Sequence, residues 1–497
     1  MVLVCLLCAG ALIPVGYVVA SGVAIGVDEL RALLWRPRAG ELLSNTVLLV
    51  VLGVPLTMAI GTGCAWLVER VQLPFRRTLA VLCAAPLAIP AFVSSYAWGS
   101  VAPGVSGLAG ALLVSVLAYS PLVFLPILAA LRGLDKAWEE AARSLGLGPW
   151  RVFFRVVLPQ LRLAMLGGGL VVGLHLLAEY GAFAFIRFDT FTTAIVVAYQ
   201  STFAGPAAAS LGIVLTSLCA LLLLGDTLLQ GHGRYARVGS GAPRRAEPLR
   251  LRPLPTAAML LLPVGYVIAA AGVPMTIVIR WLFHGTAIDV ETLVSTVLTT
   301  LALGTAGALA TVVVALPIAW LSARYPGRLS RTLAGAAYLA SSLPAIIVAL
   351  ALVTVTVRVA PAIYQSAGLV VAAYAIIFLP RAIVTLRAGI AQTPVGLEEA
   401  ARALGVSPLV ARLRVTLPLL LPTLAAATSL VALGAAGELT ATLLLAPTGT
   451  RTVATQFWAA ASSIDYAAAA PYALLLVALS APAVAIMFTH ATRGRSR

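Results

Sequence analysis

Long apolar runs recur along the whole chain and are separated by short polar segments. A run of about 20 apolar residues crosses the hydrocarbon core of a bilayer as an α-helix. The runs are too long and too uniformly apolar for the alternating strands of a β-barrel. The pattern therefore predicts an all-α integral membrane protein with about twelve spans. The predicted spans cover residues 2–24, 43–68, 78–99, 107–131, 163–184, 207–230, 256–280, 292–321, 333–357, 366–387, 420–443 and 470–490.

The composition and charge distribution agree with a membrane protein. Of the 497 residues, 61% are hydrophobic and 10% are charged, whereas a soluble protein carries about 25% charged residues. The net charge of +16 does not indicate nucleic-acid binding, because the cations lie in short loops between apolar runs. Most of the cations lie in the loops of one side, which predicts that this side and both termini face the cytoplasm. The charges beside the first span alone would favour the opposite insertion.

One charged segment occurs twice. Residues 139–146 read EEAARSLG, and residues 398–405 read EEAARALG. Each copy is followed, after nine residues, by a valine, one further residue and a Leu-Pro pair. The chain also repeats outside these segments, since Glu179 lies 40 residues after Glu139 and Glu438 lies 40 residues after Glu398. Thr193 and Thr452 keep the same spacing.

The duplication predicts two homologous membrane halves. Six spans in each half is an even number, so both halves insert in the same direction and form a parallel repeat. We expect a first transmembrane domain at residues 1–230 and a second at residues 256–497. Residues 231–255 are rich in Arg, Pro and Gly and are expected to form a flexible cytoplasmic linker that contacts anionic headgroups rather than nucleic acid.

Each charged segment has the features of a short helix that ends at a fixed point. Two glutamates at the start favour the positive end of the helix dipole, and the alanines that follow are strong helix formers. Gly146 and Gly405 are suited to end the helix. The small alanines would let the surface of a partner approach closely.

The spacing of both segments resembles the signature loop of the membrane subunits of binding-protein-dependent ABC importers. The resemblance implies the type I permease fold and a role in coupling to an ATPase, and we call residues 135–160 and 394–419 the first and second EAA loops. The residues implied in coupling are Glu139, Glu140, Ala141, Ala142, Gly146 and Pro159 in the first loop, and Glu398, Glu399, Ala400, Ala401, Gly405 and Pro418 in the second.

The same resemblance implies a location in the bacterial cytoplasmic membrane and the partners of the chain. They are two copies of an ATPase subunit, which would bind ATP and Mg²⁺, and an extracytoplasmic substrate-binding protein. The chain lacks the G-x-x-x-x-G-K-[S/T] sequence of a P-loop. We therefore expect a transport subunit of the lipid bilayer that is not an enzyme and binds no cofactor itself.

Two importer halves fused in one chain resemble the ferric-iron permeases, with thiamine permeases as the alternative. The segments that begin at Glu179 and at Glu438 are similar to the ferric type. A different class, a proton-coupled secondary transporter with internal repeats, would explain the duplication and the two acids but would leave the paired EAA loops unexplained.

Glu179 and Glu438 are candidates for a substrate path because both lie in apolar surroundings, where acids usually face an interior or a cavity. Carboxylate oxygens suit a hard cation such as Fe³⁺. The alternative is that each acid caps neighbouring backbone or pairs with an arginine and thereby fixes an outer gate. Tyr180 belongs to the same candidate gate, although an aromatic residue there also suits an interfacial anchor. Cysteines and histidines show no metal-ligand spacing.

Overall fold

A computed structural model describes residues 2–26, 28, 31–32, 35–202, 205–230, 252–284, 289–325, 327–341 and 343–492. These residues form α-helices with short 3-10 and π segments, and none of them forms a β-strand. The prediction of an all-α membrane protein is confirmed. Seven helices are long and apolar enough to cross a membrane, or up to eleven if each bent helix pair counts as one span, so the predicted count of about twelve is not confirmed.

The chain forms two compact units, and each unit combines segments from both sequence halves. The α8 unit comprises Leu34–Val197, Ser217–Thr286 and Ala461–Arg497, and the α22 unit comprises Met1–Leu33, Ala198–Thr216 and Ala287–Ala460. The predicted linker lies between the halves at residues 231–255, and its residues 231–251 lie outside the described part of the chain. Three helices cross a unit boundary: α13 (Phe191–Thr202), α14 (Gly205–Gln230) and α26 (Val453–Ser462).

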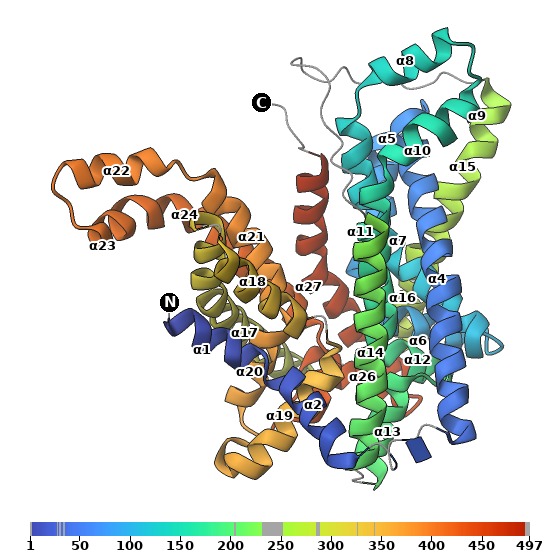
Figure 1. The fold of residues 1–497 in the computed structure, drawn as a ribbon. Helices are drawn as coiled ribbons and strands as arrows, with labels where there is room; N and C mark the ends of the chain where they lie inside the picture. Colours follow the sequence, from blue (N-terminus) through green and yellow to red (C-terminus); the bar gives the residue numbers. More distant parts are fainter. Residues whose placement is uncertain are drawn as a thin grey trace. The chain divides into compact units, whose positions relative to one another are not determined.

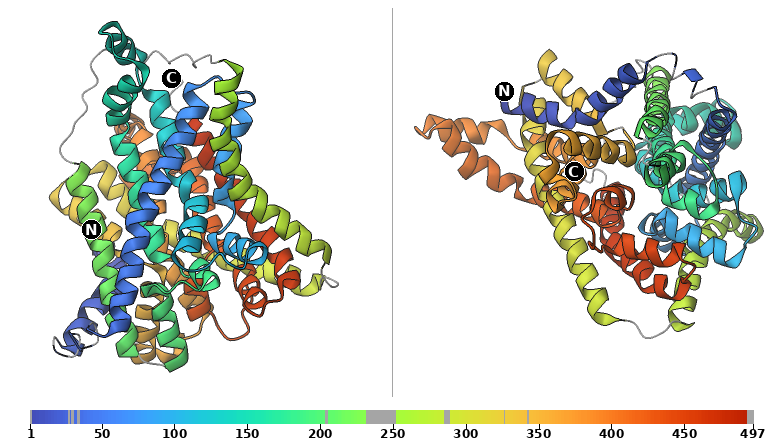
Figure 2. Two further views of the ribbon diagram at one scale, coloured as in Figure 1. Left: turned by 90° about the vertical axis from the view of Figure 1, so that its right-hand side faces the viewer. Right: turned by 90° about the horizontal axis from the view of Figure 1, so that it is seen from below.

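In the α8 unit, the long helices α4 (Pro37–Arg70) and α7 (Gly107–Gly133) lie side by side, and α11 (Arg162–Ala178) packs against both (Figures 1 and 2). Their close approach depends on glycine, since a Cβ atom at Gly61 would lie 2.8 Å from the Cβ of Val123. The other elements are α5 (Arg76–Ala84), η1 (Ala85–Ala88), α6 (Ala91–Val101), α8 (Lys136–Ser144), α9 (Pro149–Val152), η2 (Phe153–Val157), α10 (Leu158–Gln160), α12 (Gly181–Ile186), α15 (Pro253–Val267), η3 (Ile268–Gly272), α16 (Val273–His284) and α27 (Tyr466–Thr492).

In the α22 unit, α17 (Val290–Arg324) takes the central place and packs against α20 (Ala367–Ile377), α21 (Leu379–Gln392) and α24 (Leu417–Ala436). Here too a glycine permits the approach, because a Cβ atom at Gly307 would lie 2.9 Å from the Cβ of Tyr374. The other elements are α1 (Val2–Ala11), α2 (Ile13–Ile25), α18 (Arg328–Ser341), α19 (Ala345–Val359), η4 (Pro361–Ile363), α22 (Val395–Ala403), α23 (Pro408–Ala411), η5 (Arg412–Thr416) and α25 (Thr440–Leu445).

The first helices of each half pack on the helices of the other half. Helices α1 and α2 open the first half, yet they contact α18 and α19 of the second. Helices α15 and α16 open the second half, yet they contact α4, α5 and α6 of the first. The two units are therefore assembled by an exchange of helices that are distant in sequence.

Prolines break the predicted spans at matching places. Pro90 precedes α6 with φ −55° and ψ 144°, and Pro344 precedes α19 with φ −54° and ψ 143°. A proline lacks the N–H group that a continuing helix needs and disfavours helical backbone in the residue before it. The stretches predicted as spans at 78–99 and 333–357 are therefore each divided at a proline, the first between η1 and α6 and the second between α18 and α19.

Candidate functional site

The first EAA loop folds as a capped helix followed by a tight reversal. Asp135 starts α8, and its carboxylate accepts a hydrogen bond from the N–H of Ala137 at 3.0 Å. Gly146 ends the helix with φ +81°, a left-handed conformation that favours glycine. The N–H of Leu147 then donates to the carbonyl of Ala142 at 3.2 Å, which closes a Schellman-type cap.

The second EAA loop repeats this backbone. Helix α22 ends at Gly405 with φ +86°, and the N–H of Val406 donates to the carbonyl of Ala401 at 3.2 Å. Each loop then enters a five-residue π-helical segment, η2 or η5, which ends directly before the Leu-Pro pair. Nothing in the apolar pattern of the sequence signals these π segments, so sequence reasoning missed them.

The predicted coupling residues form a mostly exposed surface on each loop. Glu140, Ala141 and Pro159 are exposed in the first loop, as are Glu399, Ala400 and Pro418 in the second. Ala142 is buried and Ala401 is half-buried. The α8 loop lies at one end of α4 and α7, and α12 lies toward the opposite end (Figure 1).

An apolar side chain stands at the tip of each loop, one residue before the glycine. Leu145 is 82% exposed and Leu404 is 85% exposed. Each helix also exposes a large apolar residue at the position before its first glutamate, Trp138 in α8 and Leu397 in α22. The two loops therefore present matching apolar contacts on otherwise polar surfaces.

The first glutamate of each copy is held by a different arginine. Glu139 forms a close ion pair of 2.9 Å with Arg70 at the end of α4, and both side chains are nearly buried. Glu398 instead pairs at 3.2 Å with Arg412 of η5, within its own loop, and also accepts from the hydroxyl of Thr416 at 3.4 Å. The glutamate of the first loop thus pairs with a residue of a membrane helix, and the glutamate of the second loop pairs with a residue of its own loop.

The contacts of a tryptophan near the end of α4 and of α17 differ in the same way. The ring of Trp66 meets the ring of Phe153 edge-on, with centroids 5.5 Å apart. Arg412 occupies the position of Phe153 in the second copy, and its guanidinium lies 5.8 Å from the ring centre of Trp320. Arg324, the counterpart of Arg70, also lies over Trp320 and donates to the carbonyl of Thr393 at 3.1 Å.

Glu179 and Glu438 both cap a short helix. The Glu179 carboxylate accepts from the N–H of Ala182 at 2.8 Å, at the start of α12. Its other oxygen accepts from the hydroxyl of Tyr119 at 2.5 Å. The Glu438 carboxylate accepts from the N–H of Ala441 at 2.7 Å, at the start of α25. These are the contacts expected if each acid caps neighbouring backbone. Contact of either acid with a substrate stays a prediction.

Tyr180, the third residue of the predicted gate, is 8% exposed and lies between α11 and α12. Both acids are half-buried. Among the residues that the structure describes, no group of three or more His, Cys, Asp or Glu side chains is arranged to hold a metal ion.

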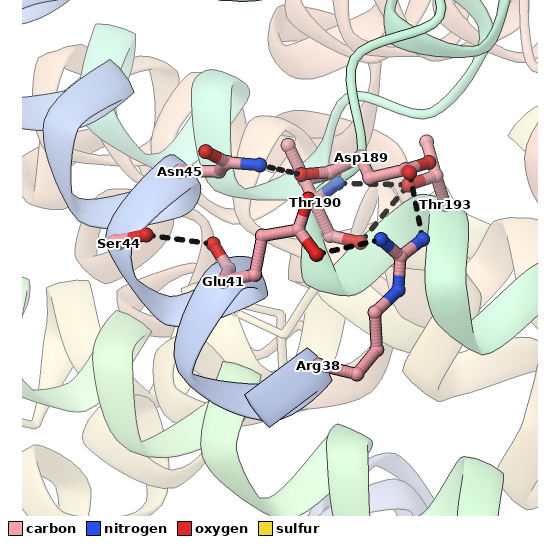
Figure 3. Close-up of polar contacts among 7 residues, drawn as sticks. All are labelled: Arg38, Glu41, Ser44, Asn45, Asp189, Thr190 and Thr193. Carbon is pink, nitrogen blue, oxygen red and sulfur yellow. Dashed lines mark hydrogen bonds and ion pairs between the residues drawn. The ribbon is translucent and has the colours of Figure 1, made fainter. Parts of the chain in front are cut away.

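A polar cluster fixes the start of α4 to the segment before α13 (Figure 3). Arg38 lies between Glu41 at 2.9 Å and Asp189 at 2.6 Å. The side-chain amide of Asn45 donates to the backbone carbonyl of Asp189 at 3.0 Å. The N–H of Thr190 donates to the hydroxyl of Thr193 at 2.8 Å, which caps α13.

The α22 unit carries the opposite charges at the equivalent place. Asp289 starts α17, and the pKa of its carboxyl group is lowered, mainly by hydrogen bonds from Thr292 and to a smaller extent by the positive charge of Arg451. The N–H of Thr452 donates to the hydroxyl of Thr455 at 2.9 Å. Thr452 therefore corresponds to Thr190, and its predicted correspondence to Thr193 is wrong. The second copy has a longer segment before its capped helix.

Comparison with known proteins identifies the family. The profile of the binding-protein-dependent transport system inner membrane component matches residues 16–232 and 315–493. The chain belongs to this family. It is 35% identical over 487 residues to the Fe(3+)-transport system permease protein FbpB 2 of Haemophilus influenzae, covering 96% of both chains.

More distant relatives of this permease match shorter parts of it. The sulfate transport system permease protein CysW of Escherichia coli is 27% identical over 34% of the chain and 64% of the relative. The molybdenum transport system permease protein ModB of the same species is 30% identical over 26% of the chain and 64% of the relative. Only the ferric-type relative, among these three, matches across both halves.

Proposed function

We propose that this permease moves ferric iron across the bacterial cytoplasmic membrane as part of an ATP-driven importer. The observation that carries the proposal is the match to a ferric-iron permease over 96% of both chains, including both halves of the duplication. Thiamine remains the alternative substrate from the sequence resemblance, and the same experiment separates the two.

We infer that each EAA loop docks on one copy of a separate ATPase subunit. The support is the pair of loops with the same backbone, each with an exposed leucine at its tip. The small alanines beside the tip allow close contact, and docking would remove the apolar surface of the exposed leucine from water, which favours binding. In this proposal both loops and both termini face the cytoplasm, as the charge distribution predicts.

The proposed transport cycle is alternating access. A soluble binding protein delivers the ferric ion at the side opposite the EAA loops. ATP binding draws the two ATPase subunits and their docked loops together, which opens the path outward, and hydrolysis resets it. The Glu139–Arg70 ion pair would carry the movement of the first loop into α4, since both side chains are nearly buried and close.

The test is the ATPase rate of the permease reconstituted in nanodiscs with its ATPase subunit. Three forms of the binding protein would be compared: ferric-loaded, thiamine-loaded and empty. We expect stimulation by the ferric-loaded form alone. Stimulation by the thiamine-loaded form would make thiamine the substrate and would leave the assignment as an ATP-driven importer unchanged. Failure to bind any ATPase subunit would favour the proton-coupled transporter.

A further inference from the structure

An arginine lies deep within one of the apolar spans of the α22 unit. Arg381 is the third residue of α21. Helices α20 and α21 form a pair with a bend of 56°, and together they are long and apolar enough to be one membrane span. Arg381 lies 14 positions after Ala367 and 11 before Gln392, which is about 21 Å and about 17 Å along the helices. An ionised side chain at this depth is costly unless water or a partner surrounds it.

The protein offers few partners to the guanidinium group of Arg381. Arg381 lies over the ring of Phe378, 5.1 Å from its centre, and interacts electrostatically with Glu438. Over the described part of the chain, its five N–H groups make no hydrogen bond and no close ion pair. The residue is exposed. Because exposure to lipid would leave the charge without compensation, the exposed guanidinium faces water or an anion.

The packing makes room for this arginine. A Cβ atom at Gly434 would lie 2.5 Å from Nη1 of Arg381 and 2.9 Å from Cε1 of Phe378. Gly434 lies one helical turn before Glu438, so the guanidinium sits against α24 beside the acid. The carboxylate of Glu438 already accepts the N–H of Ala441 at 2.7 Å, and it leaves most of the five donors of Arg381 for another ligand.

The first half lacks this arrangement. The sequence Phe124-Leu125-Pro126 is followed by Ile127, which is completely buried, whereas Phe378-Leu379-Pro380 is followed by Arg381. His175 takes the position of Gly434 and packs on the ring of Tyr119, with centroids 5.3 Å apart. At this pair of equivalent positions, only the second half carries a cation, and Ile127 shows which apolar side chain fits in its place in the first half.

We propose that Arg381 binds an oxyanion on the transport path of the second half. A guanidinium offers paired donors that match the oxygens of a phosphate-like or carboxylate ligand. The anion is either free in solution or an oxygen ligand that the ferric ion, as a hard cation, keeps during transport. The second source rests on the proposed function, and the first does not. In the absence of the anion, Glu438 supplies a negative charge that interacts with Arg381.

The first arm of the test measures binding without iron. The full permease, assembled with its ATPase subunit, would be titrated with radiolabelled inorganic phosphate as wild type, Arg381→Ile, Arg381→Lys and Arg387→Ile. Arg387→Ile is the matched control, since it makes the same change on an exposed arginine of the same helix. We expect Arg381→Ile to weaken binding about tenfold or more, which is the loss of a charge-assisted contact. We expect Arg387→Ile to bind as wild type.

The second arm measures uptake of radiolabelled iron into proteoliposomes, with phosphate present or absent. A ligand carried on the ferric ion predicts that wild type takes up phosphate together with iron, and that Arg381→Ile lowers both without changing the KM for the loaded binding protein. Phosphate binding without joint uptake would assign the site to the free anion. Unchanged phosphate binding in Arg381→Ile would overturn the proposal.

Two further outcomes are separated by the design. If Arg381→Ile failed to assemble, Arg381→Lys would be titrated in its place, because lysine keeps the positive charge and loses the paired donors. Equal phosphate binding by Arg381→Lys and wild type would then overturn the proposal that paired donors recognise the anion. If wild type showed no iron uptake, the proposed function would fail, while the phosphate titration would still decide the anion site.

Discussion

The two EAA loops share one backbone and differ in how their side chains are held. Both end at a left-handed glycine and both lead into a π-helical segment. The first, however, is bound to α4 through the buried Glu139–Arg70 pair, and the second keeps its Glu398–Arg412 pair within the loop. A single exchange, Phe153 for Arg412, accounts for the change, because the arginine takes both the tryptophan face and the glutamate. Two copies of a duplicated segment can thus keep the same backbone and exposed residues while the ion pairs that hold them differ.

The largest expected loss of stability follows from breaking the Glu139–Arg70 ion pair of the first loop. Arg70→Met should cost about 3–5 kcal/mol of unfolding free energy, because it leaves the nearly buried Glu139 with only Arg143, which is half exposed and lies 3.9 Å away. Denaturant titration in mixed micelles would measure it. The control is the double variant Arg70→Met with Glu139→Met, which should recover most of the loss. Equal stability of the single and double variants would contradict a buried pair.

The next effect tests the shared backbone. Gly146→Ala and Gly405→Ala should each cost about 1–2 kcal/mol, because an L-residue with a Cβ is strained in the left-handed conformation. A Cβ atom at either position meets no other atom within 4 Å, so the cost arises from the backbone alone. The same titration would measure both variants. A large difference between them would mean that the two loops do not share this conformation.

The smallest effect belongs to the second ion pair. Arg412→Met should cost at most about 1 kcal/mol, because the Arg412 side chain is 42% exposed and solvent screens the pair. Glu398 also keeps its contact with Thr416. If Arg412→Met proved as damaging as Arg70→Met, the second loop would be anchored as firmly as the first, and the contrast between them would be lost.

The sequence predicted the parts of this molecule that depend on local chemistry. Uniform apolar runs require helices, and Gly146 and Gly405 end the helices of the two EAA loops. The difference between Ile127 and Arg381 is also visible when the halves are aligned.

The rest depends on packing between distant residues. Apolar periodicity does not state which helices pack together, so the exchange of α1 and α2 with α15 and α16 could not be inferred. The Glu139–Arg70 pair joins residues far apart in the chain, and several arginines could have served. A change of loop length in the second copy shifted Thr452 out of the predicted alignment.

The most direct test of the account counts the ATPase subunits that bind the permease. Native mass spectrometry would compare wild type with Leu145→Asp, Leu404→Asp and the double variant. Val359→Asp is the control, since Val359 is 79% exposed at the end of α19 and lies outside both loops. The account predicts two subunits on wild type and on the control, one on each single variant and none on the double. Two subunits on the double variant would contradict docking at the EAA loops.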